Sequence, residues 1–320
     1  MRRAIAVLIK ACVSGLLLWF AASRVDWSML RDRLRDIDFY WSAVAFILLT
    51  LQTGILAARW REIVAQSGGA MTWSQAARYS FIGALFNQTM PSTIGGDAAR
   101  IWLLGKESGT WSLAAYSVIV DRAVGLLALA LFVVVCLPWT LAIVPPGMGQ
   151  YLLLVISALG FGGLVGVFLF DAIVPERWST YWFVRHPLRI ARLTKKIFTA
   201  FPANFVIGTL SIFIHVMTVV SVWMIARAMH APVDFGQVVI LIPPVMLVAA
   251  VPISIGGWGV REGVMVVAFS LVGLPQVDGF AISVMLGILL FLVGAIGGVL
   301  WIVQNGLSSL PAVGNLSNSR

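Results

Sequence analysis

Charged residues are scarce in this sequence. Of its 320 residues only 11% are Asp, Glu, Lys or Arg, whereas 60% are hydrophobic. Soluble domains carry about 25% charged residues, so the composition excludes an ordinary water-soluble domain. Several uncharged apolar runs approach or exceed the roughly 20 residues that span a bilayer as a helix. The sequence therefore predicts an all-α polytopic membrane protein.

Cysteine and the familiar catalytic motifs are also lacking. Only Cys12 and Cys136 occur, both within apolar runs, so neither a disulfide framework nor a zinc site is expected. There is no G-x-x-x-x-G-K-[ST] loop for ATP, no H-E-x-x-H and no G-x-S-x-G elbow. We expect no metal, no cofactor and no catalytic residues, and an enzyme is the less favoured class. The net charge of +9 forms no basic stripe, so no nucleic-acid partner is expected.

The apolar runs predict about six spanning helices and two interrupted segments. The spans fall on residues 4–22, 39–58, 112–139, 151–170, 204–229 and 277–304. Helical spacing predicts a surface helix over 24–38, and residues 171–202 are the only sizeable polar loop. Segments 73–105 and 236–275 each consist of two short apolar arms around a break. They are predicted to be re-entrant hairpins, or two more spans if the arms cross fully.

One phrase occurs in both interrupted segments. Residues 91–100 read PSTIGGDAAR and residues 252–261 read PISIGGWGVR. Proline and paired glycines are poor helix formers, so each phrase marks a broken helix. With hydropathy, the repeat indicates a single membrane domain over residues 1–320. It would have two pseudo-repeat halves, about 1–145 and 146–305, and a polar tail at 306–320.

The distribution of Lys and Arg predicts the topology. Placing the N-terminus in the cytoplasm puts most of these residues inside, including the basic loop 171–202, as the positive-inside rule requires. The first hairpin then opens to the cytoplasm and the second to the outside, which gives the halves inverted topology, as in many secondary transporters. We expect a multi-pass protein of the inner (plasma) membrane with both termini in the cytoplasm.

The broken phrases have the chemistry of an anion site. Non-helical backbone survives in a membrane only where it is buried in protein or lines a wet cavity. A new helix follows each break, and its first N–H groups favour phosphate or carboxylate. An arginine in the first turn adds a planar donor fork. The candidate residues for a lipid head group are Asn87, Gln88, Ser92, Thr93, Gly95, Gly96, Asp97, Arg100, Ser254, Gly256, Gly257, Arg261 and Glu262.

Simpler roles for the same residues stay open. A glycine pair can merely end a helix, an arginine can merely satisfy loose carbonyls, and Asn87 and Gln88 could cap the broken helix. A packed histidine is the favoured interpretation of His215, ahead of a proton relay.

Asp121 and Arg122 are further charges within a span. Such residues usually face a cavity or a partner. They are neighbours in sequence and point about 100° apart on a helix, so their pairing with each other is not expected. Cross-repeat pairs, in which Asp97 or Glu262 binds a distant arginine, are predicted as an equal alternative.

Three stretches carry a family resemblance. They read FNQTMPSTIGGDAARIWLL, VIVDRAVGLL and VPISIGGWGVREGVMVVAFSLVGLP, in that order. With them the chain resembles, over about residues 5–305, the integral-membrane region of bacterial lysylphosphatidylglycerol synthases, a flippase-like family with many stand-alone members. The resemblance implies lipid translocation between leaflets. Full-length synthases also carry an aminoacyl-transferase domain, which we expect to be missing here because the sequence ends soon after the last span.

Residues and resemblance together predict a flippase-like protein. It would translocate or bind a phosphate-bearing lipid, a phospholipid or a polyprenyl phosphate, without its own ATPase. Membrane lipids are its expected partners, and its oligomeric state is open. The alternatives are a lipid-modifying enzyme that uses Asp97, Asp121 or Glu262 as acid or base, an ion-coupled transporter of a small soluble anion, and a non-transporting partner of an envelope-lipid synthase.

Overall fold

The computed structural model describes residues 2–90, 94–251, 254 and 257–308. Side chains are described between residues 12 and 303. Three of the predicted site residues, Ser92, Thr93 and Gly256, lie outside the described part of the chain.

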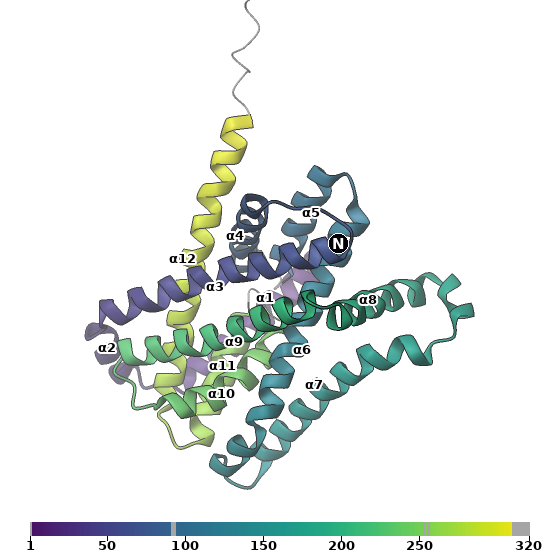
Figure 1. Ribbon diagram of the computed structural model, residues 1–320. Coiled ribbons are helices and arrows are strands. Elements are labelled where there is room, and N and C mark those ends of the chain that lie inside the picture. Colours follow the sequence, from purple (N-terminus) through teal and green to yellow (C-terminus); the bar gives the residue numbers. More distant parts are fainter. Residues whose placement is uncertain (1, 91–93, 252–253, 255–256, 309–320) are drawn as a thin grey trace, which may run out of the picture.

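The regular structure of the described chain is all helical, and no strand occurs within it (Figure 1). This confirms the predicted all-α class. The elements are α1 (Arg2–Ser23), α2 (Trp27–Arg35), α3 (Phe39–Gln66), α4 (Trp73–Thr89), α5 (Gly95–Ser108), α6 (Trp111–Ile143), α7 (Met148–Ile173), the 3₁₀ helix η1 (Glu176–Thr180), α8 (Trp182–Thr199), α9 (Ala203–Ala228), α10 (Phe235–Ala249), α11 (Val260–Leu271) and α12 (Gln276–Ser308).

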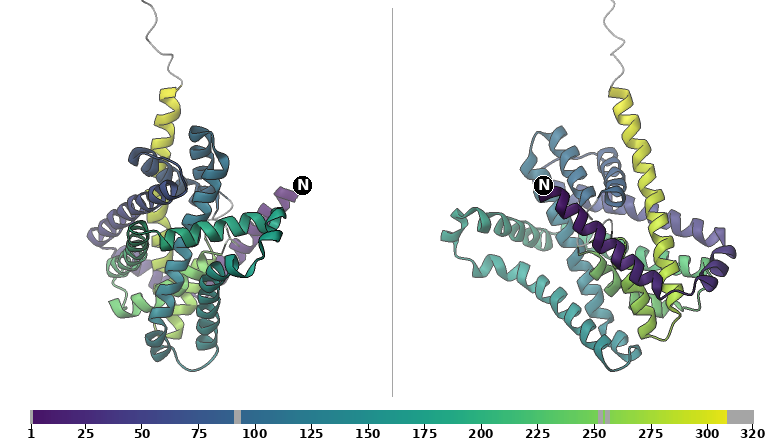
Figure 2. Two further views of the ribbon diagram at one scale, coloured as in Figure 1. Left: turned by 45° about the vertical axis from the view of Figure 1, so that its right-hand side comes forward. Right: turned by 180° about the vertical axis from the view of Figure 1, so that it is seen from behind.

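Five of the described helices are long and apolar enough to cross a membrane, namely α3, α6, α7, α9 and α12. The sixth predicted span falls on α1, whose part from Cys12 to Ser23 is a shorter apolar helix. Seen from behind, α1 runs diagonally across the bundle (Figure 2). The predicted surface helix is α2, which Asp26 caps by accepting hydrogen bonds from the amides of Ser28 and Met29.

Both interrupted segments fold as pairs of short helices. The longest of the four arms, α4, has 17 residues, which is about 26 Å at 1.5 Å per residue. That is less than the roughly 30 Å of a bilayer core. The arms of each pair pack on one another, α4 on α5 and α10 on α11. The lengths therefore fit re-entrant hairpins better than complete spans.

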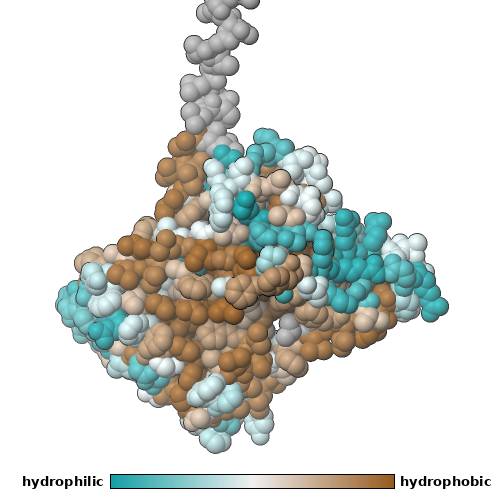
Figure 3. All heavy atoms as spheres, in the orientation of Figure 1, coloured by the Kyte–Doolittle hydropathy of each residue, from teal (hydrophilic) through white to brown (hydrophobic). Residues whose placement is uncertain are grey.

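The outer surface is largely apolar, as expected for helices surrounded by lipid. Figure 3 shows a broad brown region with hydrophilic surface gathered around α8 on the right and in smaller patches near α2 at the lower left. Helix α7 is the extreme case, since Leu159 is 71% exposed and Ile173 70%. A broad apolar surface of this kind is typical of a face that contacts lipid or another protein.

The polar segment 171–202 is more ordered than predicted. It was expected to be a loop, but it contains η1 and the 18-residue helix α8. The helix buries Val184, Leu188 and Ala191 against the bundle, while Arg185 stays exposed. The prediction was wrong because mean hydropathy over this segment averages an apolar face with a basic one.

Candidate functional site

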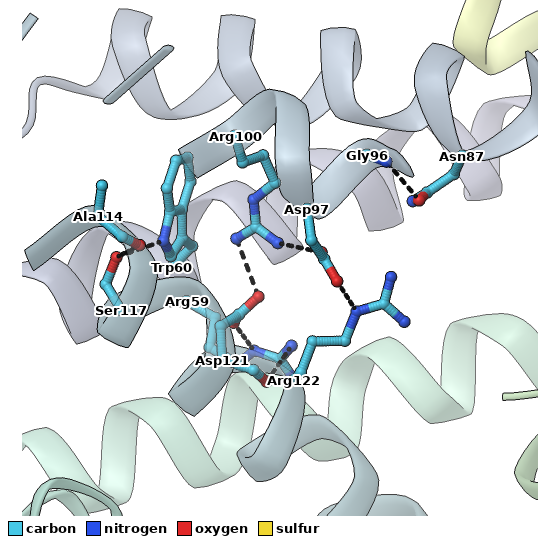
Figure 4. A network of polar contacts seen from close by, with 10 residues as sticks. All are labelled: Arg59, Trp60, Asn87, Gly96, Asp97, Arg100, Ala114, Ser117, Asp121 and Arg122. Atoms are coloured by element: carbon cyan, nitrogen blue, oxygen red, sulfur yellow. Dashed lines mark hydrogen bonds and ion pairs between the residues drawn. The ribbon is translucent and has the colours of Figure 1, made fainter. Parts of the chain in front are cut away.

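The first broken phrase is held together at the start of α5. The amide of Gly96 donates to Oδ1 of Asn87 over 2.9 Å (Figure 4). A Cβ on Gly96 would lie 2.2 Å from the carbonyl oxygen of Gly83 on α4, a distance no side chain tolerates. The glycine therefore allows the new helix to begin in direct contact with the old one. Asn87 thus caps the start of α5, which is the capping role considered from the sequence.

A cluster of five charged side chains surrounds this helix start (Figure 4). Asp121 on α6 binds two arginines at once, the Nε of Arg59 on α3 and the Nη2 of Arg100 on α5, each over 2.9 Å. Asp97 in the first turn of α5 binds the Nε of Arg122 on α6 and lies 3.7 Å from Nη1 of Arg100. Three helices are thus joined by one ionic network, called here the charged cluster.

The charged cluster is buried and carries an excess positive charge. Arg59, Arg100, Asp97 and Asp121 are each between 2% and 6% exposed, whereas the side chain of Arg122 is 38% exposed. Three guanidinium groups face two carboxylates, so the formal charge of these five residues is +1. Buried charges are expensive unless they are paired. An incoming anion would balance the excess.

Aromatic packing fixes Arg100 within the charged cluster. Its guanidinium lies 4.1 Å from the ring centroid of Trp60, a favourable cation–π distance. The indole of Trp60 in turn donates to Ser117 Oγ over 3.3 Å. Nε of Arg100 is buried and makes no hydrogen bond with any described residue. The Nε of Arg100 is therefore a donor that a further acceptor could use.

The second broken phrase is arranged differently. Arg261 Nη2 binds Oε1 of its neighbour Glu262 over 2.8 Å, and its Nε donates to Ser283 Oγ on α12 over 3.0 Å. Oε2 of Glu262 accepts from the amide of Gly259 over 2.6 Å and so caps α11. Arg261 and Glu262 are both buried. The described charges of this hairpin form a neutral pair.

Glycine conformation explains the second break. Gly257 and Gly259 have φ angles of 81° and 89°, in the left-handed region that other residues avoid. A Cβ on Gly259 would lie 2.6 Å from the carbonyl oxygen of Ser14 on α1, so α1 packs directly on the broken backbone. Ser254 is fully buried, and its Oγ makes no hydrogen bond with a described residue.

The structure brings the predicted residues into two groups. Asn87, Gly95, Gly96, Asp97 and Arg100 meet Asp121 and Arg122 at the first hairpin. Gln88 lies beside them in the sequence, and its buried Oε1 accepts no hydrogen bond from a described residue. Gly257, Arg261 and Glu262 form the second group.

The predicted cross-repeat pairs are not formed among the described residues. The described partners of Asp97 are Arg100 and Arg122, and that of Glu262 is Arg261, so each carboxylate pairs within its own half. Arg59 was missed as a site residue, because the span was expected to end at Ala58. In fact α3 continues to Gln66. Apolar residues beyond Arg59, at helical spacing through Val64, were the available signal.

Two adjoining apolar grooves lie among the helices, and one of them reaches the charged cluster. One has a volume of about 590 Å³, lies between α6, α7 and α10, and includes Ala123, the residue next to Arg122. The other, about 570 Å³, lies between α1, α6, α7, α10 and α11. They share Ile156, Leu159 and Val248. Apart from Thr140, the side chains that line them are apolar, so the grooves suit hydrocarbon.

Fold and site together define a polytopic helical membrane protein with a charged cluster at a broken helix. The chain matches the family model of the lysylphosphatidylglycerol synthase transmembrane region over residues 7–298. It therefore belongs to this family, which confirms the resemblance seen in the sequence. No curated protein matches the chain. The family relates it to lipid synthesis or flipping.

Proposed function

We propose that this protein binds a phosphate-bearing lipid, a phospholipid or a polyprenyl phosphate, at the charged cluster and moves it between the leaflets without its own ATPase. The observation that carries the proposal is the composition of the cluster. Three buried or half-buried arginines share two aspartates among membrane-embedded helices. A phosphate monoanion would neutralise the remaining charge and accept several charge-assisted hydrogen bonds.

The aspartates explain how such a site stays folded when it is empty. Asp97 and Asp121 occupy the guanidinium forks of Arg59, Arg100 and Arg122 in this structure. The planar guanidinium fork can bind phosphate as well as carboxylate, so a phosphate would compete with the two aspartates for the same donors. Arg122 is the most exposed of the three, so it is the first that a head group would reach.

The grooves supply the place for the apolar part of the ligand. A lipid that binds in the membrane must keep its chains in hydrocarbon while its head reaches the charges. The groove beside Ala123 starts next to Arg122 and runs between α6, α7 and α10. This side-by-side arrangement of charge and groove fits a lipid better than a small soluble anion.

The two phrases contribute unequally in this proposal. The head group is held by Arg100, Arg122 and the start of α5. The pair formed by Arg261 and Glu262 holds the second hairpin against α12 through Ser283. The protein lies in the inner membrane with both termini in the cytoplasm, so the basic face of α8 meets the cytoplasmic leaflet.

The direct test uses purified protein in liposomes that contain a head-group-labelled lipid, with a membrane-impermeant quencher that reports the outer leaflet. We expect the protein to increase exchange of labelled phosphatidylglycerol or polyprenyl phosphate between leaflets without ATP. The assay is repeated with proton and sodium gradients. Folded protein that moves none of these lipids under any gradient would refute transport, and would favour a lipid-modifying enzyme or a synthase partner.

A further inference from the structure

A second group of polar residues lines a separate cavity in the bundle. A cavity of about 190 Å³ between α3, α6, α9 and α10 is lined mostly by apolar residues, but Gln52, His215 and Thr218 also face it. Gln52 Nε2 donates to Thr218 Oγ1 over 2.9 Å, while its buried Oε1 makes no hydrogen bond with any described residue. An unpaired buried acceptor is costly. A water molecule occupies about 30 Å³ in the liquid, so the cavity has room for several.

His215 has one ring nitrogen engaged. Its Nε2 lies 3.0 Å from the carbonyl oxygen of Gly125 on α6. A carbonyl accepts and never donates, so Nε2 carries the proton of the neutral ring. Nδ1 is then the atom that can take up a second proton, and no described hydrogen bond engages it. The imidazole is therefore placed between the backbone of α6 and a cavity that Gln52 and Thr218 also line.

The charged groups near His215 belong to the charged cluster. On α3, the guanidinium of Arg59 lies against Gly125, where a Cβ would be 3.2 Å from Nη2. Arg59 also donates to Ser211 Oγ over 3.2 Å, one turn before His215 on α9. On α6, Asp121 lies one turn before Gly125 and binds Arg59. The α10 residues that line the cavity, Ile242, Pro243 and Met246, carry no charge.

We propose that His215 is a proton-binding site coupled to the lipid site. Nδ1 takes up a proton from the surrounding solution when an anionic head group binds at the charged cluster, and releases it to the solution when the lipid leaves. The inference rests on the proposed function, and it adds the coupling ion. It also gives a role to a part-buried histidine, a cavity and a glutamine whose Oε1 accepts no described hydrogen bond, none of which lipid binding alone uses.

Electrostatics sets the sign of the coupling. The five side chains of the charged cluster carry a formal charge of +1, so a further positive charge on His215 beside Arg59 is disfavoured. A bound phosphate removes that penalty. Because linkage is reciprocal, protonation of His215 strengthens lipid binding by the same factor. A proton gradient could then drive lipid movement in a protein that has no ATP-binding motif.

The test is a calorimetric titration of short-chain phosphatidylglycerol into the protein in phosphatidylcholine nanodiscs. Two buffers with different heats of ionisation, at mildly acidic pH, give the number of protons taken up per lipid. Inorganic phosphate, titrated separately, shows whether the lipid chains are required. We expect measurable proton uptake by the wild type and none by His215→Gln, whose amide can still donate to Gly125. His186→Gln and His230→Gln are the matched controls and should behave like the wild type.

The affinity itself gives a second readout. For one coupled proton it rises by up to about tenfold per unit fall in pH, and the rise is lost in His215→Gln. Lipid binding by the wild type without proton uptake, or undiminished uptake by His215→Gln with an unchanged melting temperature, overturns the proposal.

Complete absence of binding would instead contradict the proposed function. In that case NMR of ¹⁵N-histidine-labelled protein decides whether His215 is coupled to the cluster. A titration of His215 that moves when Arg122 is changed to Gln, a cluster variant expected to keep its stability, supports the coupling, and one that does not move refutes it.

Discussion

Arg100 and Arg261 occupy the same position in the repeated phrase but have different neighbours. Arg100 shares Asp97 and Asp121 with two further arginines, whereas Arg261 pairs with the adjacent Glu262. Sequence symmetry thus places both arginines at a helix start without giving them the same electrostatic surroundings. That both arginines bind phosphate stays a prediction. The excess positive charge favours phosphate binding at the first hairpin, where Arg100 lies.

At Arg122 we predict a loss of function with little loss of stability. Arg122→Gln removes a charge-assisted contact to the head group, worth about 1.5–3 kcal/mol, which is about one to two orders of magnitude in affinity. Translocation in proteoliposomes should fall accordingly, with partial recovery in Arg122→Lys. The exposed Arg31 on α2 provides the control Arg31→Gln. A fall in melting temperature that tracks the loss of activity would indicate a structural arginine instead.

At Asp121 we predict a large loss of stability. Asp121→Asn leaves the buried guanidinium groups of Arg59 and Arg100 without their shared carboxylate, and breaking a buried pair costs about 3–5 kcal/mol. Thermal unfolding in detergent measures the effect. The double variant Asp121→Asn with Arg59→Gln should recover part of the stability, because one uncompensated charge is removed. An unchanged melting temperature in the single variant would refute the importance of the network.

Several members of the charged cluster could be identified from the sequence, but their pairing could not. Asp97, Arg100, Asp121 and Arg122 are conspicuous because charges are rare within apolar runs. Which carboxylate meets which arginine depends on how α3, α5 and α6 pack, and sequence spacing does not fix that. Arg59 was missed for a local reason, since a hydropathy window ends a span at the first pair of charges.

At the scale of elements, the two broken helices were predictable and the basic helix was not. Proline and paired glycines interrupt an apolar period visibly, so both hairpins could be placed within a few residues. Helix α8 alternates an apolar stripe with arginines and lysines, and its mean hydropathy resembles that of a loop. Its helical period was present in the sequence, at Val184, Leu188 and Ala191.

The contact between α4 and α5 gives an element-scale prediction. Gly96→Ala would place a Cβ against the carbonyl of Gly83, and overpacking of this kind costs about 1–3 kcal/mol. We expect a lower melting temperature and weaker lipid binding, because the start of α5 must shift. The control is Gly208→Ala on α9, where nothing lies within 4 Å of the new methyl group. Equal stability of the two variants would contradict this packing argument.

At the scale of the whole molecule, the contacts between helices are symmetric with respect to the two halves of the chain. Helix α3 packs on α9, α4 on α12, and α6 on α10. The counterpart of α3 is α9, that of α4 is α10, and that of α6 is α12. When each helix is replaced by its counterpart, the contact between α4 and α12 becomes the contact between α10 and α6, and the contact between α3 and α9 is unchanged. We propose an inverted repeat on this basis. In this proposal the two hairpins would enter the membrane from opposite sides.

Topology is tested by single-cysteine labelling in a background without Cys12 and Cys136. Met148 and Trp182 are suitable positions, since they are 82% and 73% exposed. We predict that a cysteine at 148 reacts with an impermeant reagent from outside the cell and that a cysteine at 182 reacts only from the cytoplasmic side. Reaction of both from the same side would exclude the inverted arrangement.

The central claim is that the charged cluster holds a phosphate-bearing lipid, and native mass spectrometry of protein extracted with its own lipids tests it most directly. We predict a lipid adduct that contains phosphate on the wild type and on Arg31→Gln, and its loss from Arg122→Gln at an unchanged melting temperature. The same adduct on all three proteins, or phosphate-free lipids alone on the wild type, would contradict the account.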